Sequence, residues 1–250
     1  MPTANEPTGR GSTRTAVVWS GLEPVLGRGE GEPHDVLDIG GGTGGFAVRV
    51  AALGHRVTVV DPSPDALAAL DRRAREHDVA VTGRQGDLST LLDVVAADSA
   101  DVVLCHGVLE VVDDPAAALA TLARVVRPGG VLSLLVAQRH AAVVARAMAG
   151  HFQQALDLLA AGAPAGAPAG PVGRAGRRYT DDELTALVAD AGFVVDAVHA
   201  VRVFTDLVPG SLLDLEPGAS AALVELEQAV ATRPEYLPLA TQLHLLAHTS

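Results

Sequence analysis

The sequence predicts an α/β fold in which a mostly parallel sheet carries helices on both of its faces. Short apolar runs rich in Val, Ile and Leu alternate with stretches of helical periodicity, and this alternation is typical of a parallel sheet. The length of 250 residues suits one such domain, and 48% hydrophobic residues are enough for a large core. Right-handed crossovers bring the carboxyl ends of the strands to one edge of the sheet, where we expect the ligand.

The first half of the chain carries the clearest elements. Ser63 suits the cap of one helix, with Pro64 at its first position, and Gly54 suits the left-handed residue that ends the helix before it. Residues 127–130 are expected to form a turn that ends a later helix. The expected strands are 35–39, 56–60, 79–83, 101–106 and 131–136, and the expected helices are 46–53, 64–77 and 115–126.

The second half changes character. Residues 140–160 are rich in alanine and are expected to be helical, whereas residues 161–171 repeat Ala, Pro and Gly and are expected to form a mobile loop. Another helix is expected to begin at Asp181 and Asp182 and to end at Gly192. The last expected elements form an antiparallel closure at the sheet edge and are the strands 193–204 and 242–249 with the helix 222–231 between them.

Composition excludes several classes of function. The formal net charge is −12, and all 18 basic residues are arginines. Without lysine the chain cannot form a Schiff base or the Gly-Lys-Ser/Thr phosphate loop. A single cysteine excludes an internal disulfide framework and a cysteine-cluster zinc site. The nine histidines are scattered without ligand spacing, so no metal is expected.

Two further expectations concern location and partners. The first residues are polar and rich in Pro, Gly and Thr, and no run of the chain reaches transmembrane length without a charge or turn. A cytoplasmic location is therefore expected, without a membrane partner. The acidity argues against a protein that coats nucleic acid by bulk charge, but a local arginine face stays open.

The strongest local signal is the glycine-rich stretch after the first expected strand. Asp38 lies in that strand, and the glycines at 40–42 follow it, directly before a helix. Glycine is needed where a turn is tight and a ligand approaches the backbone. Asp61 ends the next strand, where a carboxylate can accept hydrogen bonds from ribose hydroxyls. Asp87 ends the third strand, where an adenine would lie.

Two cofactors compete for this motif. Gly40, Gly42 and Gly45 also satisfy the G-x-G-x-x-G pattern of dinucleotide sites, so NAD must be considered. A dinucleotide places its pyrophosphate at the helix N-terminus, where the carboxylate of Asp38 would repel it. S-adenosylmethionine carries an ammonium and a sulfonium, which a carboxylate attracts. The sequence therefore favours S-adenosylmethionine over NAD.

These residues in this order resemble the class I S-adenosylmethionine-dependent methyltransferases, over nearly the whole chain after about residue 35. The resemblance implies a Rossmann-like, seven-stranded, mostly parallel sheet with helices on both faces and a small helical insertion that caps the substrate. The residues that carry it are Asp38, Gly40, Gly42, Gly44, Asp61, Asp87 and the turn at 127–130.

Further stretches resemble one subfamily, the tRNA 5-carboxymethoxyuridine methyltransferases, which methylate a carboxylate on the wobble uridine. Together they cover most of the chain, which generic methyltransferase patterning does not explain. The stretches are RTAVVW (14–19), HGVLE (106–110), RPGGVLSL (127–134), AGHF (149–152), VRVFTD (201–206) and VELE (224–227).

The resemblance implies roles for several side chains. Arg14 would reach back to the cofactor and hold its methionine carboxylate, and His106 would contact the cofactor at the tip of the fourth strand. Arg202 is the candidate that grips the substrate carboxylate, with Asp206 as its orienting partner. The expected cofactor-binding residues are Arg14, Asp38, Gly40, Gly41, Gly42, Asp61, Asp87, Leu88 and His106.

The chemistry implied by the resemblance asks little of the protein. A carboxylate is already a nucleophile at neutral pH, so methyl transfer needs positioning rather than a general base. A tRNA partner would be bound through only a few arginines. The acidic chain and the neutral loop at 161–171 favour a small-molecule O- or N-methyltransferase as the alternative. A module without catalytic activity is a third reading, which the intact Asp38, Asp61 and glycines oppose. The candidate RNA-contacting arginines are Arg139, Arg146, Arg174, Arg177, Arg178 and Arg202.

We expect four segments along the chain. They are an N-terminal cofactor-covering segment (1–34), the S-adenosylmethionine-binding core (35–139), a helical insertion with its loop (140–180), and the C-terminal part of the sheet with the substrate-side residues (181–250).

Overall fold

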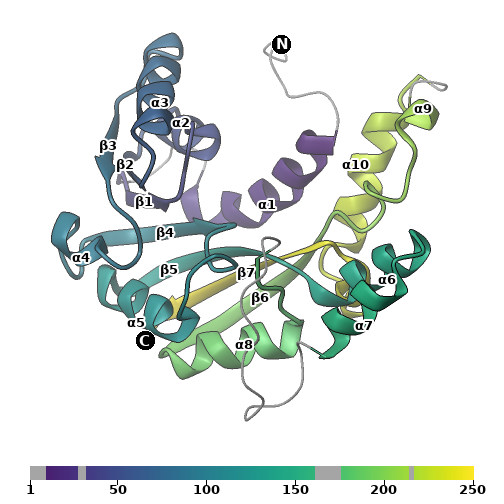
Figure 1. The fold of residues 1–250 in the computed structure, drawn as a ribbon. Helices are drawn as coiled ribbons and strands as arrows, with labels where there is room; N and C mark the ends of the chain where they lie inside the picture. Colours follow the sequence, from purple (N-terminus) through teal and green to yellow (C-terminus); the bar gives the residue numbers. More distant parts are fainter. Residues whose placement is uncertain (1–9, 28–31, 161–175, 214–216) are drawn as a thin grey trace. The chain divides into compact units, whose positions relative to one another are not determined.

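A computed structural model describes residues 10–27, 32–160, 176–213 and 217–250 (Figure 1). In these ranges seven strands form one sheet in the order β3-β2-β1-β4-β5-β7-β6. The pairs β1–β2, β1–β4, β2–β3 and β4–β5 are parallel. The strands are β1 (Asp35–Ile39), β2 (Arg56–Asp61), β3 (Val81–Gln85), β4 (Ala100–His106), β5 (Val126–Ala137), β6 (Phe193–Val201) and β7 (Gln242–Thr249). The helices are α1 (Arg10–Leu26), α2 (Gly45–Ala51), α3 (Pro64–Glu76), α4 (Leu91–Val94), α5 (Pro115–Val125), α6 (Arg139–Met148), α7 (Phe152–Ala160), α8 (Asp181–Asp190), α9 (Gly210–Leu213), α10 (Ala219–Val230) and the 3₁₀ helix η1 (Pro234–Leu239).

The predicted α/β fold is confirmed, and local chemistry explains its elements. The Ser63 side chain accepts a hydrogen bond from Ala66 N at 3.2 Å and caps α3, whose first residue is Pro64. Gly54 follows α2 with a φ of 94°, which glycine adopts without steric cost. The strands β1 and β7 have the predicted bounds, and β7 and β6 lie at one edge of the sheet.

The chain divides into two compact units. The sheet unit comprises Leu22–Val136, Asp182–Ala197 and Leu245–Ser250. Its core consists of fully buried aliphatic side chains from the central strands, such as Ile39 of β1 and Leu104 of β4. Figure 1 shows α2 and α3 on one face of this unit's strands and α5 and α8 on the other, the arrangement that buries both faces of a parallel sheet.

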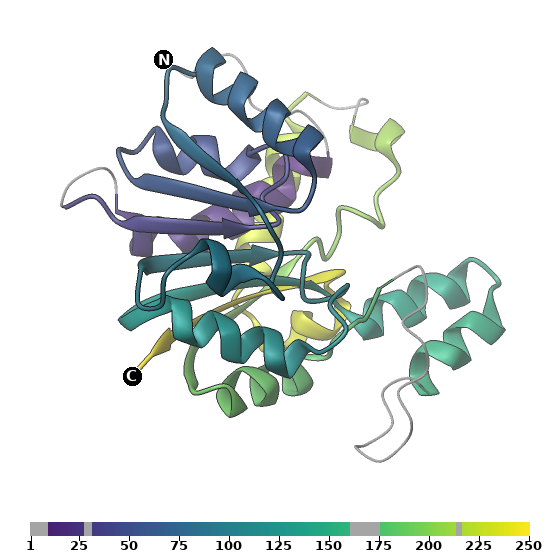
Figure 2. The ribbon, with the colours of Figure 1, turned by 60° about the vertical axis from the view of Figure 1, so that its left-hand side comes forward.

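The second unit, which we call the Arg202 unit, comprises Met1–Gly21, Ala137–Asp181 and Val198–His244. Its helices α6 and α7 pack side by side as a hairpin (Figure 2). A small apolar core fixes the segment that follows β6. Its members are Ala200, Val203, Val230 and Ala240, with Phe204, Tyr236 and Leu237 packed against them.

Several predicted elements differ from the observed ones, mostly by one to three residues at an end. Residues 127–130 do not form a separate turn but lie within β5, which begins at Val126. The strand accommodates them through an irregular register against β4 and a φ of 74° at Gly129, because Pro128 has no N–H for the ladder. The third strand is shifted by two residues, to Val81–Gln85, and β6 ends at Val201 rather than at 204. The helical stretch 140–160 is two helices, broken at Gly150 with a φ of 76°. The predicted loop at 161–171 lies outside the described residues.

Among the described helices, none has both the length and the apolar character needed to cross a lipid bilayer.

Candidate functional site

The glycine-rich stretch forms a tight loop between β1 and α2. Gly40 and Gly42 have φ values of 65° and 54°, a backbone region that favours glycine. The N–H of Gly40 donates to the carbonyl of Val60 at 2.8 Å, and the N–H of Gly42 donates to Oδ2 of Asp61 at 2.9 Å. The loop is therefore attached to the end of β2 by two hydrogen bonds, and its shape is fixed by the chain itself.

Asp38 is the most unusual carboxyl group of the sheet unit. The residue is 3% exposed, and in the described part of the chain no hydrogen bond or ion pair reaches its carboxylate. Burial, and secondarily the charge of Asp61, raises the pKa of Asp38 to about 7. A Cβ on Gly41 would lie 2.4 Å from its Oδ2, so only glycine leaves room beside this carboxylate. A cation bound here would favour the charged form of Asp38, and the ammonium of S-adenosylmethionine fits that requirement.

The carboxylate of Asp61 joins the loop to α3. Besides the bond from Gly42, its Oδ1 accepts a hydrogen bond from the N–H of Ser63 at 2.9 Å. The side chain is nearly buried, with 7% of the residue exposed. This geometry holds a carboxylate at the end of β2, where the sequence predicts the ribose contact.

Asp87 and Leu88 follow β3 on a short turn. Oδ1 of Asp87 accepts hydrogen bonds from the N–H and hydroxyl groups of Ser89 and Thr90, at 2.6 to 3.2 Å. These bonds, with that from the Ser89 hydroxyl foremost, lower the pKa of Asp87 and keep it ionised. Leu88 is buried beside this exposed carboxylate. These are the two residues for which the sequence predicts the adenine contact.

His106 ends β4 and is held by two neighbours. Its Nε2 lies 2.8 Å from the hydroxyl of Ser133, which is fully buried on β5. The ring of Phe46 meets the imidazole edge to face, with the centroids 5.1 Å apart. The imidazole is thus oriented at the carboxyl edge of the sheet, on the same side as the glycine loop after β1.

Arg202 and Asp206 form the second predicted pair, in the Arg202 unit. Arg202 follows β6 with a φ of 60°, which costs a non-glycine residue about 1–2 kcal/mol. Its Nη2 donates to Oδ1 of Asp206, while Oδ2 of Asp206 accepts a hydrogen bond from the hydroxyl of Thr241 at 3.0 Å. The backbone N–H of Thr241 also donates to the carbonyl of Arg202 at 3.3 Å. The Nε of Arg202 is buried and has no hydrogen-bond partner among the described residues.

The other predicted arginines are placed as follows. Arg14 is half-buried on α1, in the Arg202 unit. Arg139, at the start of α6, donates through Nη2 to the carbonyl of Arg178 at 2.8 Å. This bond fastens the segment that follows the predicted loop to α6. Arg174 lies outside the described residues.

Glu227, which sequence reasoning did not single out as a site residue, belongs to the same polar cluster as Arg202. It is fully buried and accepts hydrogen bonds from the segment that begins just after Arg202. Its signal in the sequence is a charge on an apolar face, since Leu223, Glu227 and Val230 are spaced by four and three residues along α10. A buried glutamate at such a position requires hydrogen-bond donors, and the sequence alone does not show which residues supply them.

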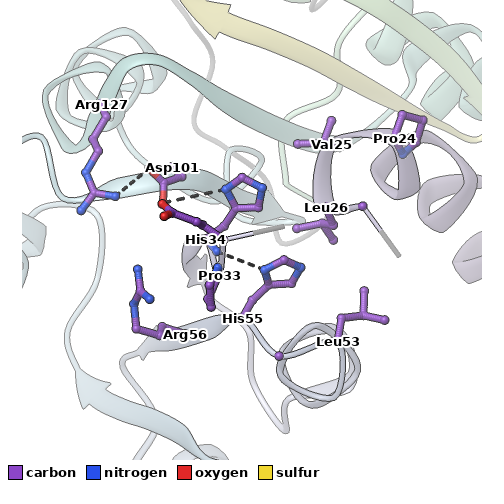
Figure 3. Close-up of a pocket in the computed structure, with 13 residues that line it drawn as sticks. Pro24, Val25, Leu26, Pro33, His34, Leu53, His55, Arg56, Asp101 and Arg127 are labelled. Atoms are coloured by element: carbon purple, nitrogen blue, oxygen red, sulfur yellow. Dashed lines mark hydrogen bonds and ion pairs between the residues drawn. The ribbon is translucent and has the colours of Figure 1, made fainter. Parts of the chain in front are cut away.

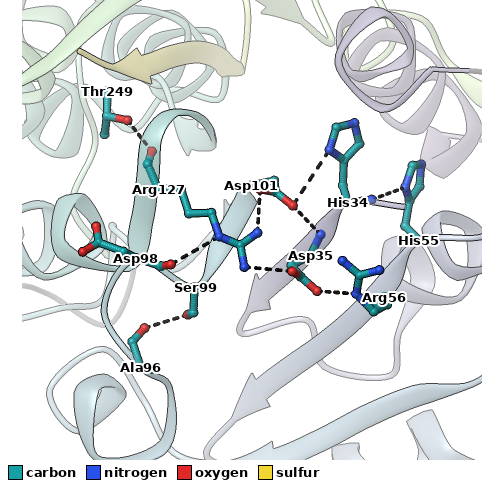
Figure 4. A network of polar contacts seen from close by, with 10 residues as sticks. All are labelled: His34, Asp35, His55, Arg56, Ala96, Asp98, Ser99, Asp101, Arg127 and Thr249. Atoms are coloured by element: carbon teal, nitrogen blue, oxygen red, sulfur yellow. Dashed lines mark hydrogen bonds and ion pairs between the residues drawn. The ribbon is translucent and has the colours of Figure 1, made fainter. Parts of the chain in front are cut away.

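A second polar cluster surrounds the start of β1, at the opposite end of the strand from the glycine loop (Figure 4). Arg127 donates to Asp35 at 2.9 Å and to Asp101 at 2.6 Å, and Arg56 donates to Asp35 at 2.6 Å. Hydrogen bonds from Arg56, and then from Arg127, lower the pKa of Asp35 to about 2. Since both arginines are engaged by carboxylates, this cluster joins the starts of the central strands β1, β2, β4 and β5.

A pocket of about 680 Å³ lies beside this cluster (Figure 3). Asp101 and Arg127 line it together with His34 and His55, whose rings stack with centroids 5.2 Å apart. In the described ranges, no group of three or more His, Cys, Asp or Glu side chains is arranged to hold a metal ion.

Residues 37–134 match the family model described as "Methyltransferase domain". The chain is 30% identical over 253 residues to tRNA 5-carboxymethoxyuridine methyltransferase of Escherichia coli (strain K12), covering 96% of this chain and 89% of the relative. It is 35% identical over 131 residues to a ubiquinone biosynthesis O-methyltransferase of Xanthomonas axonopodis pv. citri, covering 52% of this chain and 54% of the relative.

Solved structures share the fold at lower identity. An S-adenosylmethionine-dependent methyltransferase from Mesorhizobium loti superposes with a TM-score of 0.61 at 19% identity, over 94% of this chain and 99% of that one. The [4+2]-cyclase SpnF superposes with a TM-score of 0.60 at 18% identity, over 98% of this chain and 84% of that one. Since a cyclase shares the architecture, the fold by itself does not fix the reaction.

Proposed function

Because the chain belongs to the S-adenosylmethionine-dependent methyltransferases, we propose that it methylates the carboxylate of a modified wobble uridine in tRNA by direct in-line transfer. The enzyme class and the cofactor follow from the family. The observation that carries the choice of substrate is the likeness to the Escherichia coli tRNA 5-carboxymethoxyuridine methyltransferase, which extends over 96% of this chain. A tRNA substrate would go with a cytoplasmic location, which is part of the same proposal.

The sheet unit offers the groups that would hold the cofactor. The residues of the glycine loop, with Asp38 and Asp61, would hold its ammonium and ribose, while Asp87 and Leu88 would hold its adenine. His106 would contact it from the end of β4. The pairing of its carboxylate with Arg14, which belongs to the Arg202 unit, stays a prediction from the sequence. When bound, S-adenosylmethionine supplies a methyl group on an electrophilic sulfonium. These assignments rest on the space that Gly41 leaves beside Asp38, on the unpaired Asp38 carboxylate and on the chemistry of the acidic side chains.

The residues around Arg202 suit an anionic methyl acceptor. The side chain of Arg202 is 28% exposed, so its guanidinium offers hydrogen-bond donors to a carboxylate oxygen. The ion pair with Asp206 offsets part of the positive charge, so that a gripped carboxylate keeps its nucleophilicity. The substrate is ionised at neutral pH and needs no general base. The chain's contribution is then to hold one carboxylate oxygen in line with the methyl group.

The experiment that tests the substrate is nucleoside mass spectrometry of tRNA from a strain in which this gene is deleted. Loss of the methyl ester on the wobble uridine, restored by the wild-type gene, supports the proposal. Unchanged wobble uridines would refute it.

The role of Arg202 is tested with Arg202→Ala. This substitution should leave the affinity for S-adenosylmethionine unchanged in calorimetry, yet lower kcat/KM for the tRNA by about 10-fold to 100-fold, because a charged hydrogen bond to the substrate is lost. Arg72→Ala is a matched control, since Arg72 is exposed on α3 and is not among the predicted site residues. A loss of cofactor affinity in Arg202→Ala would show that the arginine serves the cofactor instead.

A small-molecule O- or N-methyltransferase is the second candidate. The likeness to the ubiquinone biosynthesis O-methyltransferase favours it, although that likeness covers 52% of this chain. The net charge of −12 also favours an acceptor without a phosphate backbone. Unaltered tRNA in the deletion strain, together with methylation of a phenol or amine by the purified enzyme, would decide for this alternative.

A further inference from the structure

One buried carboxylate organises the segment that carries Arg202. Glu227, on α10, has no exposed surface. Its Oε2 accepts a hydrogen bond from the N–H of Val203 at 2.8 Å. Its Oε1 accepts bonds from the N–H of Phe204 at 3.0 Å, the N–H of Thr205 at 2.8 Å and the hydroxyl of Thr205 at 2.6 Å. Three successive amides and one hydroxyl therefore converge on one side chain from a distant part of the sequence.

This arrangement is an anion-binding turn in which the anion is part of the protein. In an extended strand successive N–H groups point to opposite sides, so they converge on one group only where the backbone departs from the strand conformation. Arg202 supplies that departure with its φ of 60°. The conformation is disfavoured for arginine, so it persists only where the surroundings impose it. The bonds from residues 203–205 to Glu227 are such a constraint.

The partners of Glu227 are polar groups rather than a cation. No ion pair to its carboxylate is found among the described residues, and the chain has no lysine. Val203 and Thr205 are buried, so their N–H groups would lack partners without Glu227. The charge and the amides therefore depend on each other, and the removal of either leaves the other unsatisfied.

The opposite side of the same segment is fixed by Thr241. Its N–H and hydroxyl reach the carbonyl of Arg202, and the hydroxyl also reaches Asp206. Glu227 constrains the backbone after Arg202, and Thr241 constrains its carbonyl and its carboxylate partner. The turn at 202–206, which carries the guanidinium, is thus fixed by Glu227 through residues 203–205 and by Thr241 at the Arg202 carbonyl and at Asp206.

We propose that Glu227 is a positioning residue, which sets the place of the Arg202 guanidinium for the carboxylate of the methyl acceptor. This inference rests on the proposed function for the identity of the acceptor. Its structural half, that Glu227 holds the turn at 202–206, stands apart from the acceptor and is tested separately.

The structural half is tested with purified Glu227→Gln, compared with wild type and with Glu225→Gln. Glu225 lies exposed on the same helix, so the control makes the same charge change without the contacts. In Glu227→Gln the amide nitrogen faces the Val203 N–H, donor against donor. Hydrogen exchange measured by mass spectrometry should speed up by about tenfold or more in the peptide containing 203–205, and the Arg202 Nε–H resonance should shift. Exchange and resonance like those of wild type would overturn the proposal.

The functional half is tested by a double-mutant cycle on tRNA carrying 5-carboxymethoxyuridine. Glu227→Gln should lower kcat/KM for this tRNA by about tenfold or more while the Kd for S-adenosylmethionine stays unchanged. In an Arg202→Ala background the same substitution should have little further effect, because it acts through Arg202. If the two substitutions lower kcat/KM independently, so that their effects multiply in the double variant, the role of Glu227 is only structural and the proposal is overturned.

Two provisions keep the test decisive. If Glu227→Gln does not fold, Thr205→Val replaces it, since this change removes one donor to the carboxylate at nearly constant shape and should give the same cycle with a smaller loss. If wild type does not methylate the tRNA, the proposed function fails by itself, and the exchange and resonance measurements still decide whether Glu227 holds the turn.

Discussion

The buried carboxyl group of Asp38 predicts an unusual dependence of stability on pH. Its pKa is about 7 in the folded protein and 3.8 in a free carboxyl of this type. Between these two pH values, the folded protein holds a proton that the unfolded chain has released. Raising the pH through this interval therefore lowers the free energy of unfolding. For a residue that is 3% exposed, the pKa difference corresponds to about 4 kcal/mol.

Asp38→Asn removes the charge at nearly constant shape and makes this cost measurable. The variant should match wild type near pH 4 and exceed it above pH 7 by up to about 4 kcal/mol. Urea unfolding at a series of pH values measures the difference, and Asp93→Asn, at an exposed position on α4, serves as the control. The same variant should lose affinity for S-adenosylmethionine in calorimetry, because an amide no longer attracts an ammonium. A variant with the pH profile of wild type, or with its cofactor affinity, would refute this account of Asp38.

Two further predictions concern the glycine loop and the ion pairs of Arg127 with Asp35 and Asp101. Gly41→Ala places a Cβ 2.4 Å from Oδ2 of Asp38, so the Kd for S-adenosylmethionine should rise by about tenfold or more. Gly210→Ala, whose Cβ meets nothing within 4 Å, should leave that Kd unchanged. Equal Kd values for the two variants would contradict the requirement for glycine beside Asp38. Arg127→Ala should cost about 1 kcal/mol in urea unfolding at neutral pH, a modest loss because its ion pairs are about one-third exposed. Since the pKa of Asp35 is lowered to about 2, stability present above pH 3.8 is lost as the pH falls toward 2 in wild type, and this loss should be smaller in Arg127→Ala.

The sequence predicted best what is encoded locally. The Ser63 cap, the glycine after α2 and the bounds of β1 depend on neighbouring residues, and they are confirmed. The break at Gly150 was missed because alanine on both sides favours helix, so the left-handed glycine did not stand out. The extension of β5 through residues 127–130 depends on pairing with β4, which propensity cannot see.

The candidate site divides in the same way. Asp38 and Asp61 were predicted as site residues because strand ends and glycines mark their positions in the sequence. Their electrostatics were not, because the raised pKa of Asp38 follows from burial and from the nearby charge of Asp61. The partnership of Glu227 with residues 203–205 joins segments more than twenty residues apart, and only the packing of α10 reveals it.

The strand order has a consequence for how the chain is made. β7 lies between β5 and β6, although it is the last of the seven strands in the sequence. During synthesis from the N-terminus, the sides of β5 and β6 that pair with β7 stay unpaired until residues 242–249 have left the ribosome. Unpaired strand edges can form hydrogen bonds with other chains. The position between β5 and β6 is therefore filled only by the eight-residue strand β7, and a nascent chain stalled before that strand would be exposed to aggregation.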